Sequence, residues 1–156
     1  MPDILTRIFA RKALRRHEDE RRIPYEEMAR RAEARNGERR NFLAALERAP
    51  GIAVIAEIKR ASPSAGIIAD TFDPVAVARR YGEANVDAIS VLTEEEHFLG
   101  DLTYLDLVRA VSAAPLLRKD FIATPYEVAA SAAAGADAVL LIVAALDDDA
   151  IRACMR

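Results

Sequence analysis

Two opposite charges stand close together at the end of an apolar segment, in the stretch V-I-A-E-I-K-R-A-S-P-S at 54–64. Glu57 and Lys59 are two residues apart, and because side chains alternate along a β-strand, both would lie on the same face. Burying a carboxylate and an ammonium group is costly unless they are paired or used. In parallel α/β folds, active sites form at the carboxyl ends of strands, where this pair stands. The segment therefore predicts a functional site that includes Glu57 and Lys59.

A second charged strand end follows at L-R-K-D-F, residues 117–121. Alternation predicts that Lys119 and Phe121 share one face of the strand, and that Arg118 and Asp120 share the other. A lysine and a phenylalanine that both point inward suit an aromatic substrate with a group to be protonated. We therefore expect Lys119 and Phe121 in the same site as the first pair.

Two further segments can supply apolar walls. The loop T-E-E-E-H-F-L-G at 93–100 offers Phe98, and the apolar end of the fourth strand offers Leu140. Ser62 and Ser64 lie in the loop after the first strand. No histidine is placed to activate either hydroxyl group, so a nucleophilic serine is not expected.

Each of these features also has a structural explanation that stays open. Glu57 and Lys59 could be an ion pair inside a barrel, and Lys119 could only pair with Glu57 or Asp120. The two phenylalanines could be ordinary core residues. Residue type and spacing alone do not separate these explanations from a role in chemistry.

A metal site is not expected, although His97 follows three glutamates at 94–96. No second histidine stands at ligand spacing, and the glutamates are typical of a solvated turn. The isolated glycines at 66 and 100 do not form a dinucleotide-binding fingerprint.

The composition restricts the class of protein. The chain has 156 residues, of which 52% are hydrophobic and 30% charged, with a formal net charge of −3. These values are typical of a globular protein and exclude a disordered chain. The longest apolar run, 136–146, is shorter than the roughly 20 residues that cross a bilayer, and no signal-peptide core is present. We therefore expect a cytoplasmic protein without membrane or nucleic-acid partners and, with Cys154 alone, without an internal disulfide.

The predicted elements are a helical segment followed by alternating strands and helices. Residues 1–50 form the helical segment, and 51–156 hold strands at 53–59, 88–93, 116–121 and 138–144 with helices between them. A weak repeat relates D-A-I-S-V-L at 87–92 to D-A-V-L-L-I at 137–142. The order indicates an α/β fold with four βα units and a parallel sheet. A complete eightfold barrel needs about 250 residues, so the chain would hold roughly half of one.

These residues together resemble the indole-3-glycerol phosphate synthase family. The matching segments are R-N-F-L-A-A-L (40–46), I-A-E-I-K-R-A-S-P-S (55–64), S-V-L-T-E-E-E-H-F-L-G (90–100), L-R-K-D-F-I (117–122) and G-A-D-A-V-L-L-I-V-A-A-L (135–146). The resemblance covers essentially the whole chain. It implies a (βα)₈ TIM barrel with an N-terminal helical extension, here represented by the extension and the first (βα)₄ half.

The resemblance also implies a reaction, a ring closure in tryptophan biosynthesis catalysed by a carboxy-lyase that needs no cofactor and no metal. The substrate of the family is the phosphorylated compound 1-(2-carboxyphenylamino)-1-deoxyribulose 5-phosphate, which loses carbon dioxide and water. By position, Lys119 resembles the general acid, Lys59 a contact to anionic groups, and Glu57 the carboxylate that orients the hydroxyl groups of the substrate. Ser62 resembles a substrate-binding loop residue.

The same resemblance implies that Phe98, Phe121 and Leu140 line the pocket for the aromatic ring. The family continues through four more strands, which carry its second catalytic glutamate and its phosphate-binding loops. These are not among the 156 residues, so we expect this chain alone to be inactive. An alternative is a half-barrel without catalysis that associates with itself or with a C-terminal half. Phosphoribosylanthranilate isomerase fits less well, because it lacks the N-terminal extension and the L-R-K-D-F motif.

Overall fold

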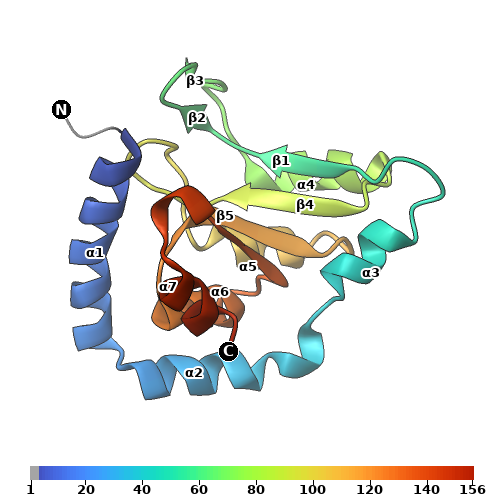
Figure 1. Cartoon of the computed structure of the whole chain (residues 1–156). Coiled ribbons are helices and arrows are strands. Elements are labelled where there is room, and N and C mark those ends of the chain that lie inside the picture. The colour runs from blue at the N-terminus through green and yellow to red at the C-terminus, as the bar shows by residue number, and fades with distance from the viewer. Residues whose placement is uncertain (1–3) are drawn as a thin grey trace.

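A four-stranded parallel sheet forms the centre of the computed structural model, which describes residues 4–156 (Figure 1). The strands follow the spatial order β1 (Ile55–Ile58), β4 (Ala88–Leu92), β5 (Leu116–Ile122) and β6 (Ala138–Leu141). Helices α4 (Pro74–Glu83), α5 (Tyr104–Arg109) and α6 (Pro125–Ala133) connect successive strands of this sheet, and α7 (Asp148–Cys154) follows β6. The alternation of strands and helices and the parallel pairing confirm the predicted α/β fold.

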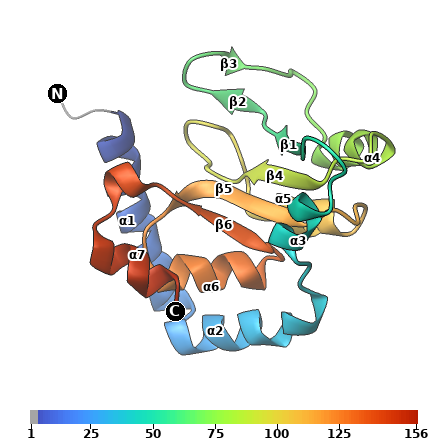
Figure 2. The same cartoon turned by 45° about the vertical axis from the view of Figure 1, so that its right-hand side comes forward.

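The N-terminal segment runs along three sides of this sheet, as Figure 1 shows. It consists of α1 (Ile4–Arg22), α2 (Tyr25–Ala34), a 3₁₀ turn η1 (Asn36–Glu38) and α3 (Phe42–Glu47). Helix α1 lies beside the carboxyl ends of the strands, and α2 packs along α6 (Figure 2). The break between α1 and α2 falls at Pro24, which cannot continue a helix because it has no backbone N–H group.

The hydrophobic core lies on one face of the sheet, here called the outer face, where α4 and α5 cover it. Ile58, Ile89 and Leu116 from three neighbouring strands are at most 1% exposed there, and Leu105 and Val108 of α5 pack against them. The opposite face, here called the inner face, carries Glu57, Ser90 and Lys119. The outer face therefore holds the hydrophobic core, and the inner face carries Glu57 and Lys119.

The burial pattern of β5 shows this division residue by residue. From Leu116 to Ile122 buried and half-buried side chains alternate without exception. The buried residues point to the outer face, and the half-buried ones, which include Lys119 and Phe121, point to the inner face. The period of two that was read from the sequence is therefore present in the strand.

The weak internal repeat has a structural cause. The carboxylate of Asp87 accepts a hydrogen bond from the backbone N–H of Val54 at 2.7 Å, and that of Asp137 accepts one from Leu116 at 2.8 Å. Each aspartate therefore stands before its own strand and holds the beginning of the neighbouring strand. The two copies of the repeat therefore make the same hydrogen bond between neighbouring strands.

The boundaries of some elements differ from the prediction. The fourth strand ends at Leu141 rather than at 144, because a 3₁₀ turn η2 (Val143–Ala145) follows it. A short antiparallel hairpin of β2 (Ala61–Ser62) and β3 (Gly66–Ile67) was not predicted, since strands of two residues show no periodicity. Within residues 4–156, no helix is both long enough and apolar enough to cross a membrane.

Candidate active site

The carboxylate of Glu57 accepts hydrogen bonds from two lysines near the carboxyl end of the sheet. Its Oε1 atom accepts one from Lys59 Nζ at 2.7 Å, and its Oε2 atom accepts one from Lys119 Nζ at 3.2 Å. Glu57 lies on β1 and Lys119 on β5, on either side of β4. The strand register thus brings together two residues that are 62 positions apart.

These three side chains are neither buried nor fully exposed. Glu57, Lys59 and Lys119 expose 30%, 31% and 37% of their side-chain surface. Burial raises the pKa of Glu57, but the hydrogen bonds from Lys59 and Lys119 outweigh this effect and hold the pKa below its ordinary value. An ionised carboxylate between two ammonium groups leaves one net positive charge, which favours an anionic ligand.

A pocket of about 380 Å³ lies beside this cluster and has both apolar and polar walls. Its lining residues come from α1, from the end of β1 and the loop after it, and from two phenylalanines: Ile4, Leu5, Ile8, Lys59, Ser62, Pro63, Ser64, Phe98 and Phe121. A pocket of this size, with a few polar groups in an apolar wall, suits a small organic ligand.

Aromatic rings form one side of this pocket. The ring centres of Phe98 and Phe121 are 6.1 Å apart with an interplanar angle of 41°, and Phe9 of α1 meets Phe121 edge to face at 5.7 Å. Such distances are those of interacting aromatic pairs. The rings pack against one another, and Phe98 and Phe121 offer an apolar surface to a ligand.

The loop after β1 is shaped by the β2–β3 hairpin. Ser62 stands at the end of β2, and its Oγ atom accepts a hydrogen bond from the backbone N–H of Ala65 at 3.2 Å. Gly66, at φ +64°, supplies the left-handed conformation that closes the turn. The hairpin therefore presents Ser62 and Ser64 to the pocket.

The structure brings together six of the seven residues that the sequence singled out. Lys59, Ser62, Phe98 and Phe121 line the pocket, and Glu57 and Lys119 join it through their hydrogen bonds. Leu140 is not among its lining residues. It stands on β6, the edge strand farthest from β1, although the register places it on the inner face.

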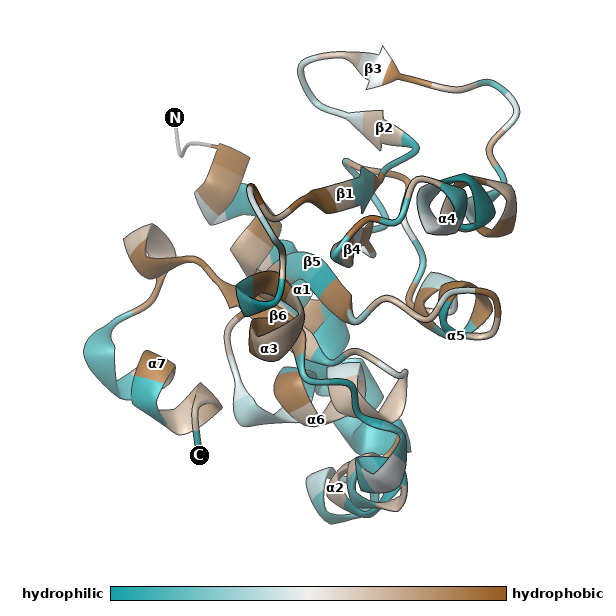
Figure 3. Cartoon of the chain, turned by 90° about the vertical axis from the view of Figure 1, so that its right-hand side faces the viewer, coloured by the Kyte–Doolittle hydropathy of each residue, from teal (hydrophilic) through white to brown (hydrophobic). Residues whose placement is uncertain are grey.

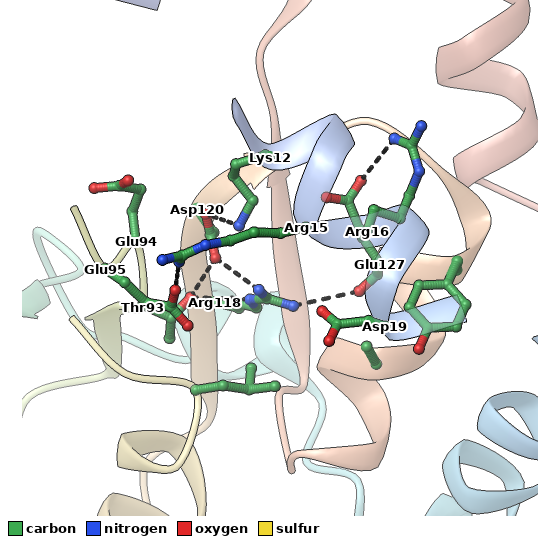
Figure 4. A pocket seen from close by; sticks show the side chains of 13 residues that line it. Lys12, Arg15, Arg16, Asp19, Thr93, Glu94, Glu95, Arg118, Asp120 and Glu127 are labelled. Atoms are coloured by element: carbon green, nitrogen blue, oxygen red, sulfur yellow. Dashed lines mark hydrogen bonds and ion pairs between the residues drawn. The ribbon is translucent and has the colours of Figure 1, made fainter. Parts of the chain in front are cut away.

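A second cluster lies behind this site, on the outer face of β5 (Figure 4). Both carboxylate oxygens of Asp120 are bonded: Lys12 Nζ of α1 lies 2.6 Å from one, and Arg118 Nη2 lies 2.6 Å from the other. Thr93 donates its hydroxyl to Asp120 at 2.7 Å and accepts a hydrogen bond from Arg118 Nε at 2.9 Å. The polar groups at the centre of this cluster are thus paired with one another, which is typical of a structural network.

The position of Lys12 was not visible in the sequence. It stands in a run of charges that looks like a solvated helix face, yet its side chain is only 19% exposed. The one available signal was that Asp120, on the buried face of an apolar strand, needs cationic partners. This indicates that Asp120 has a cationic partner but does not identify it, because Lys12 is 108 residues away in the sequence.

The prediction of a solvated turn at 94–96 was wrong for Glu94. Its side chain is 5% exposed, and its oxygens accept hydrogen bonds from backbone N–H groups of its own loop. His97 lies beside it, with Nδ1 3.4 Å from Glu94 Oε1. Within residues 4–156, no three His, Cys, Asp or Glu side chains are grouped so that they could hold a metal ion.

Comparison with known proteins gives one consistent result. The family model for indole-3-glycerol phosphate synthase matches residues 5–156. Proteins of that name from Roseiflexus castenholzii and Alkaliphilus metalliredigens are 46% and 48% identical, over 99% and 92% of this chain. One from Mycobacterium ulcerans is 56% identical over 71% of the chain. The matched regions cover 60%, 54% and 40% of these three proteins, so the chain spans roughly half of their length.

Proposed function

The chain belongs to the indole-3-glycerol phosphate synthase family, and from this premise we propose that it carries the first half of an enzyme of tryptophan biosynthesis. The proposed reaction closes the indole ring of 1-(2-carboxyphenylamino)-1-deoxyribulose 5-phosphate. The aryl ring attacks the ribulose carbonyl carbon, the carboxylate leaves as carbon dioxide, and a hydroxyl group leaves as water. The observation that carries the proposal is the Glu57 carboxylate held between Lys59 and Lys119 beside an aromatic pocket.

Each polar residue of the cluster has a proposed role. Lys119 acts as the general acid, which protonates the carbonyl oxygen while the ring attacks. Lys59 reaches into the pocket and binds anionic groups of the substrate. Glu57 holds both ammonium groups and orients the hydroxyl groups of the substrate. A positioned acid in a partly closed pocket needs no reorganisation at the moment of reaction, which is how such sites gain rate.

The apolar part of the site has a proposed role as well. Phe98 and Phe121 hold the aromatic ring of the substrate, and Ser62 contacts it from the hairpin after β1. Leu140 would close the wall on the β6 side. Leu140 does not line the pocket formed by the described residues, so this role requires a pocket that extends toward β6.

A second candidate function is that of a half-barrel that binds another half-barrel. The supporting observation is the sheet itself, whose outermost strands β1 and β6 each have a neighbour on one side only within residues 4–156. Such edges present unpaired N–H and C=O groups to other strands. In this case the partner is a second copy of the chain or the C-terminal half of a related barrel.

The proposed catalytic role is tested in a complete-barrel chimera, in which residues 1–156 are followed by the C-terminal part of the Roseiflexus castenholzii relative. Lys119→Met should lower kcat by at least about a hundredfold, the usual contribution of a general acid. Arg79→Met is the control, because it also removes one positive charge but stands exposed on α4. Product indole fluorescence measures turnover. Near-normal turnover with Lys119→Met, in a variant with unchanged circular dichroism, would show that Lys119 only supports the fold.

A further inference from the structure

The loop between β4 and α5 is organised around one buried carboxylate. Glu94 Oε1 accepts a hydrogen bond from the backbone N–H of Glu96 at 3.2 Å, and Oε2 accepts one from His97 at 2.7 Å and one from Phe98 at 3.0 Å. The side chain is 5% exposed. A carboxylate at that depth is stable only because these amide groups replace its hydration shell.

The backbone of this loop is also fixed at its far end. The carbonyl oxygen of Glu94 accepts a hydrogen bond from the N–H of Gly100 at 2.7 Å, which closes the loop into a ring. Leu99 has φ +51°, a left-handed conformation that non-glycine residues rarely adopt. A Cβ atom on Gly100 would lie 2.5 Å from the carbonyl oxygen of Leu92, so the loop lies directly against β4. The loop therefore has little freedom as long as its central carboxylate is bonded.

Two walls of the pocket depend on this loop. One is the ring of Phe98, whose own backbone N–H is bonded to Glu94. The other is the hairpin after β1, because the carbonyl oxygen of Phe98 accepts a hydrogen bond from the N–H of Ala61 at 3.2 Å. Ala61 is 4% exposed and directly precedes Ser62. The Glu94 carboxylate thus acts on both walls through Phe98.

The neighbouring glutamates have a different role. Glu95 forms an ion pair with Arg15 of α1, and Glu96 forms ion pairs with Arg11 and Arg15. These pairs are on the surface, where an ion pair contributes little to stability. Of the three consecutive glutamates, Glu94 is the one buried inside the loop. Its exposed neighbour Glu95 is therefore a matched control for substitution.

We infer that Glu94 is a positioning residue of this site, whose carboxylate holds Phe98 and the hairpin after β1 at the distance that the aromatic part of the substrate requires. The catalytic consequence rests on the proposed function, whereas the effect on the loop does not. Glu94→Gln keeps the size of the side chain but replaces one acceptor oxygen by an NH₂ group. That group cannot accept a hydrogen bond from the backbone N–H groups that Glu94 binds, so the variant loses at least one of these bonds.

The first test uses tryptophan as a reporter, because the chain contains none. Phe98→Trp places a single indole ring in the loop. The rate at which acrylamide quenches its fluorescence measures how accessible the ring is to the quencher. Adding Glu94→Gln should raise the quenching constant about twofold or more, since hydrogen bonds to a charged group are the strong ones. Adding Glu95→Gln should leave it unchanged. Equal quenching in the two double variants, with the same circular dichroism, would overturn the inference.

The second test needs no substitution. In the complete-barrel chimera with its sequence at 94–98 unchanged, the amide hydrogens of Glu96, His97 and Phe98 should exchange with solvent at least about tenfold more slowly than that of Glu95, because bonded amides are protected. Equal exchange rates would contradict the inference even if Glu94→Gln fails to fold.

The third test separates positioning from simple support of the fold. In the complete-barrel chimera, Glu94→Gln should raise KM about tenfold and change kcat less, because the pocket is displaced while Lys119 stays on β5. A variant that only loses folded enzyme would show a lower kcat with an unchanged KM. If the chimera has no activity with any sequence at 94, the proposed function fails, while the quenching and exchange results still decide the role of Glu94.

Discussion

At the scale of single residues, the most strongly constrained charge is that of Asp120. Its side chain is fully buried, with Arg118 and Lys12 as its cationic partners. Burial raises the pKa of Asp120, but the positive charges of Arg118 and Lys12 outweigh it, so the pKa lies well below its ordinary value of 3.8. Because the folded state binds the proton less readily than the unfolded chain, ionised Asp120 stabilises the fold.

The sign of this effect gives a prediction about acid. The contribution of Asp120 should be complete above about pH 5 and should be lost progressively as the pH falls below 3.8 toward the lower pKa of the folded state. Asp120→Asn should therefore lower the free energy of unfolding at pH 7 and flatten its decline in acid. Urea unfolding of the chimera from pH 7 to pH 3 measures both effects. The exposed Asp70→Asn should change neither, and an Asp120→Asn variant with an unchanged acid slope would contradict the prediction.

At the scale of elements, the attachment of α1 rests on contacts of very different strength. Lys12 reaches a buried carboxylate on β5, whereas its neighbour Arg11 forms a surface pair with Glu96 at 2.9 Å. Loss of Lys12 removes a charged hydrogen bond from a buried carboxylate that keeps Arg118 as its partner, whereas loss of Arg11 leaves a surface carboxylate that water can hydrate. Adjacent residues of one helix thus differ in what they contribute.

We expect Lys12→Met to destabilise the fold by about 2 kcal/mol, the usual contribution of a hydrogen bond to a charged group, because Arg118 still neutralises Asp120. Arg11→Met should cost at most about 1 kcal/mol. Urea midpoints of the two chimera variants measure the difference. Similar midpoints would mean that α1 is held by its apolar residues, such as Ile8, rather than by Lys12.

The strands could be predicted from the sequence, but some short elements and charged-residue environments could not. The four strands and the inward face of Glu57 and Lys119 follow from local composition and alternation, which the backbone enforces. The β2–β3 hairpin is too short to leave a pattern. The environments of Lys12 and Glu94 depend on contacts between distant segments or on loop backbone geometry, and both residues therefore looked like solvated charges. What was missed is thus the tertiary environment of charged residues, not their location on an element.

At the scale of the whole molecule, the inner face and the edges of the sheet are the open features. Apolar side chains lie exposed on or beside the edge strands β1 and β6, where Val54, Ile55 and Val143 are 49%, 44% and 75% exposed. Figure 3 shows the hydrophobic colour over the first part of β1. Exposed apolar surface next to unpaired strand edges promotes association.

We therefore expect the 156-residue polypeptide to associate with itself, or to be only partly folded, rather than to form a compact monomer. It should show no measurable synthase turnover. Sedimentation equilibrium at micromolar concentration, near-ultraviolet circular dichroism and the indole fluorescence assay test these statements. A monomer with a sharp thermal transition would mean that the N-terminal helices cover the open sheet sufficiently. Turnover near that of the complete-barrel chimera would mean that residues 1–156 contain every essential group.

The alternation along β5 has one more consequence, for changes in chain length. Removing one residue between Leu116 and Lys119 would exchange the two faces of every position beyond the deletion. Asp120 would then point to the inner face and Lys119 to the outer face, into the hydrophobic core. The same deletion in the exposed loop at 63–68 would leave the facing of every residue in β5 unchanged. Evolution and design can therefore vary the length of exposed loops, whereas within β5 they are restricted to substitutions.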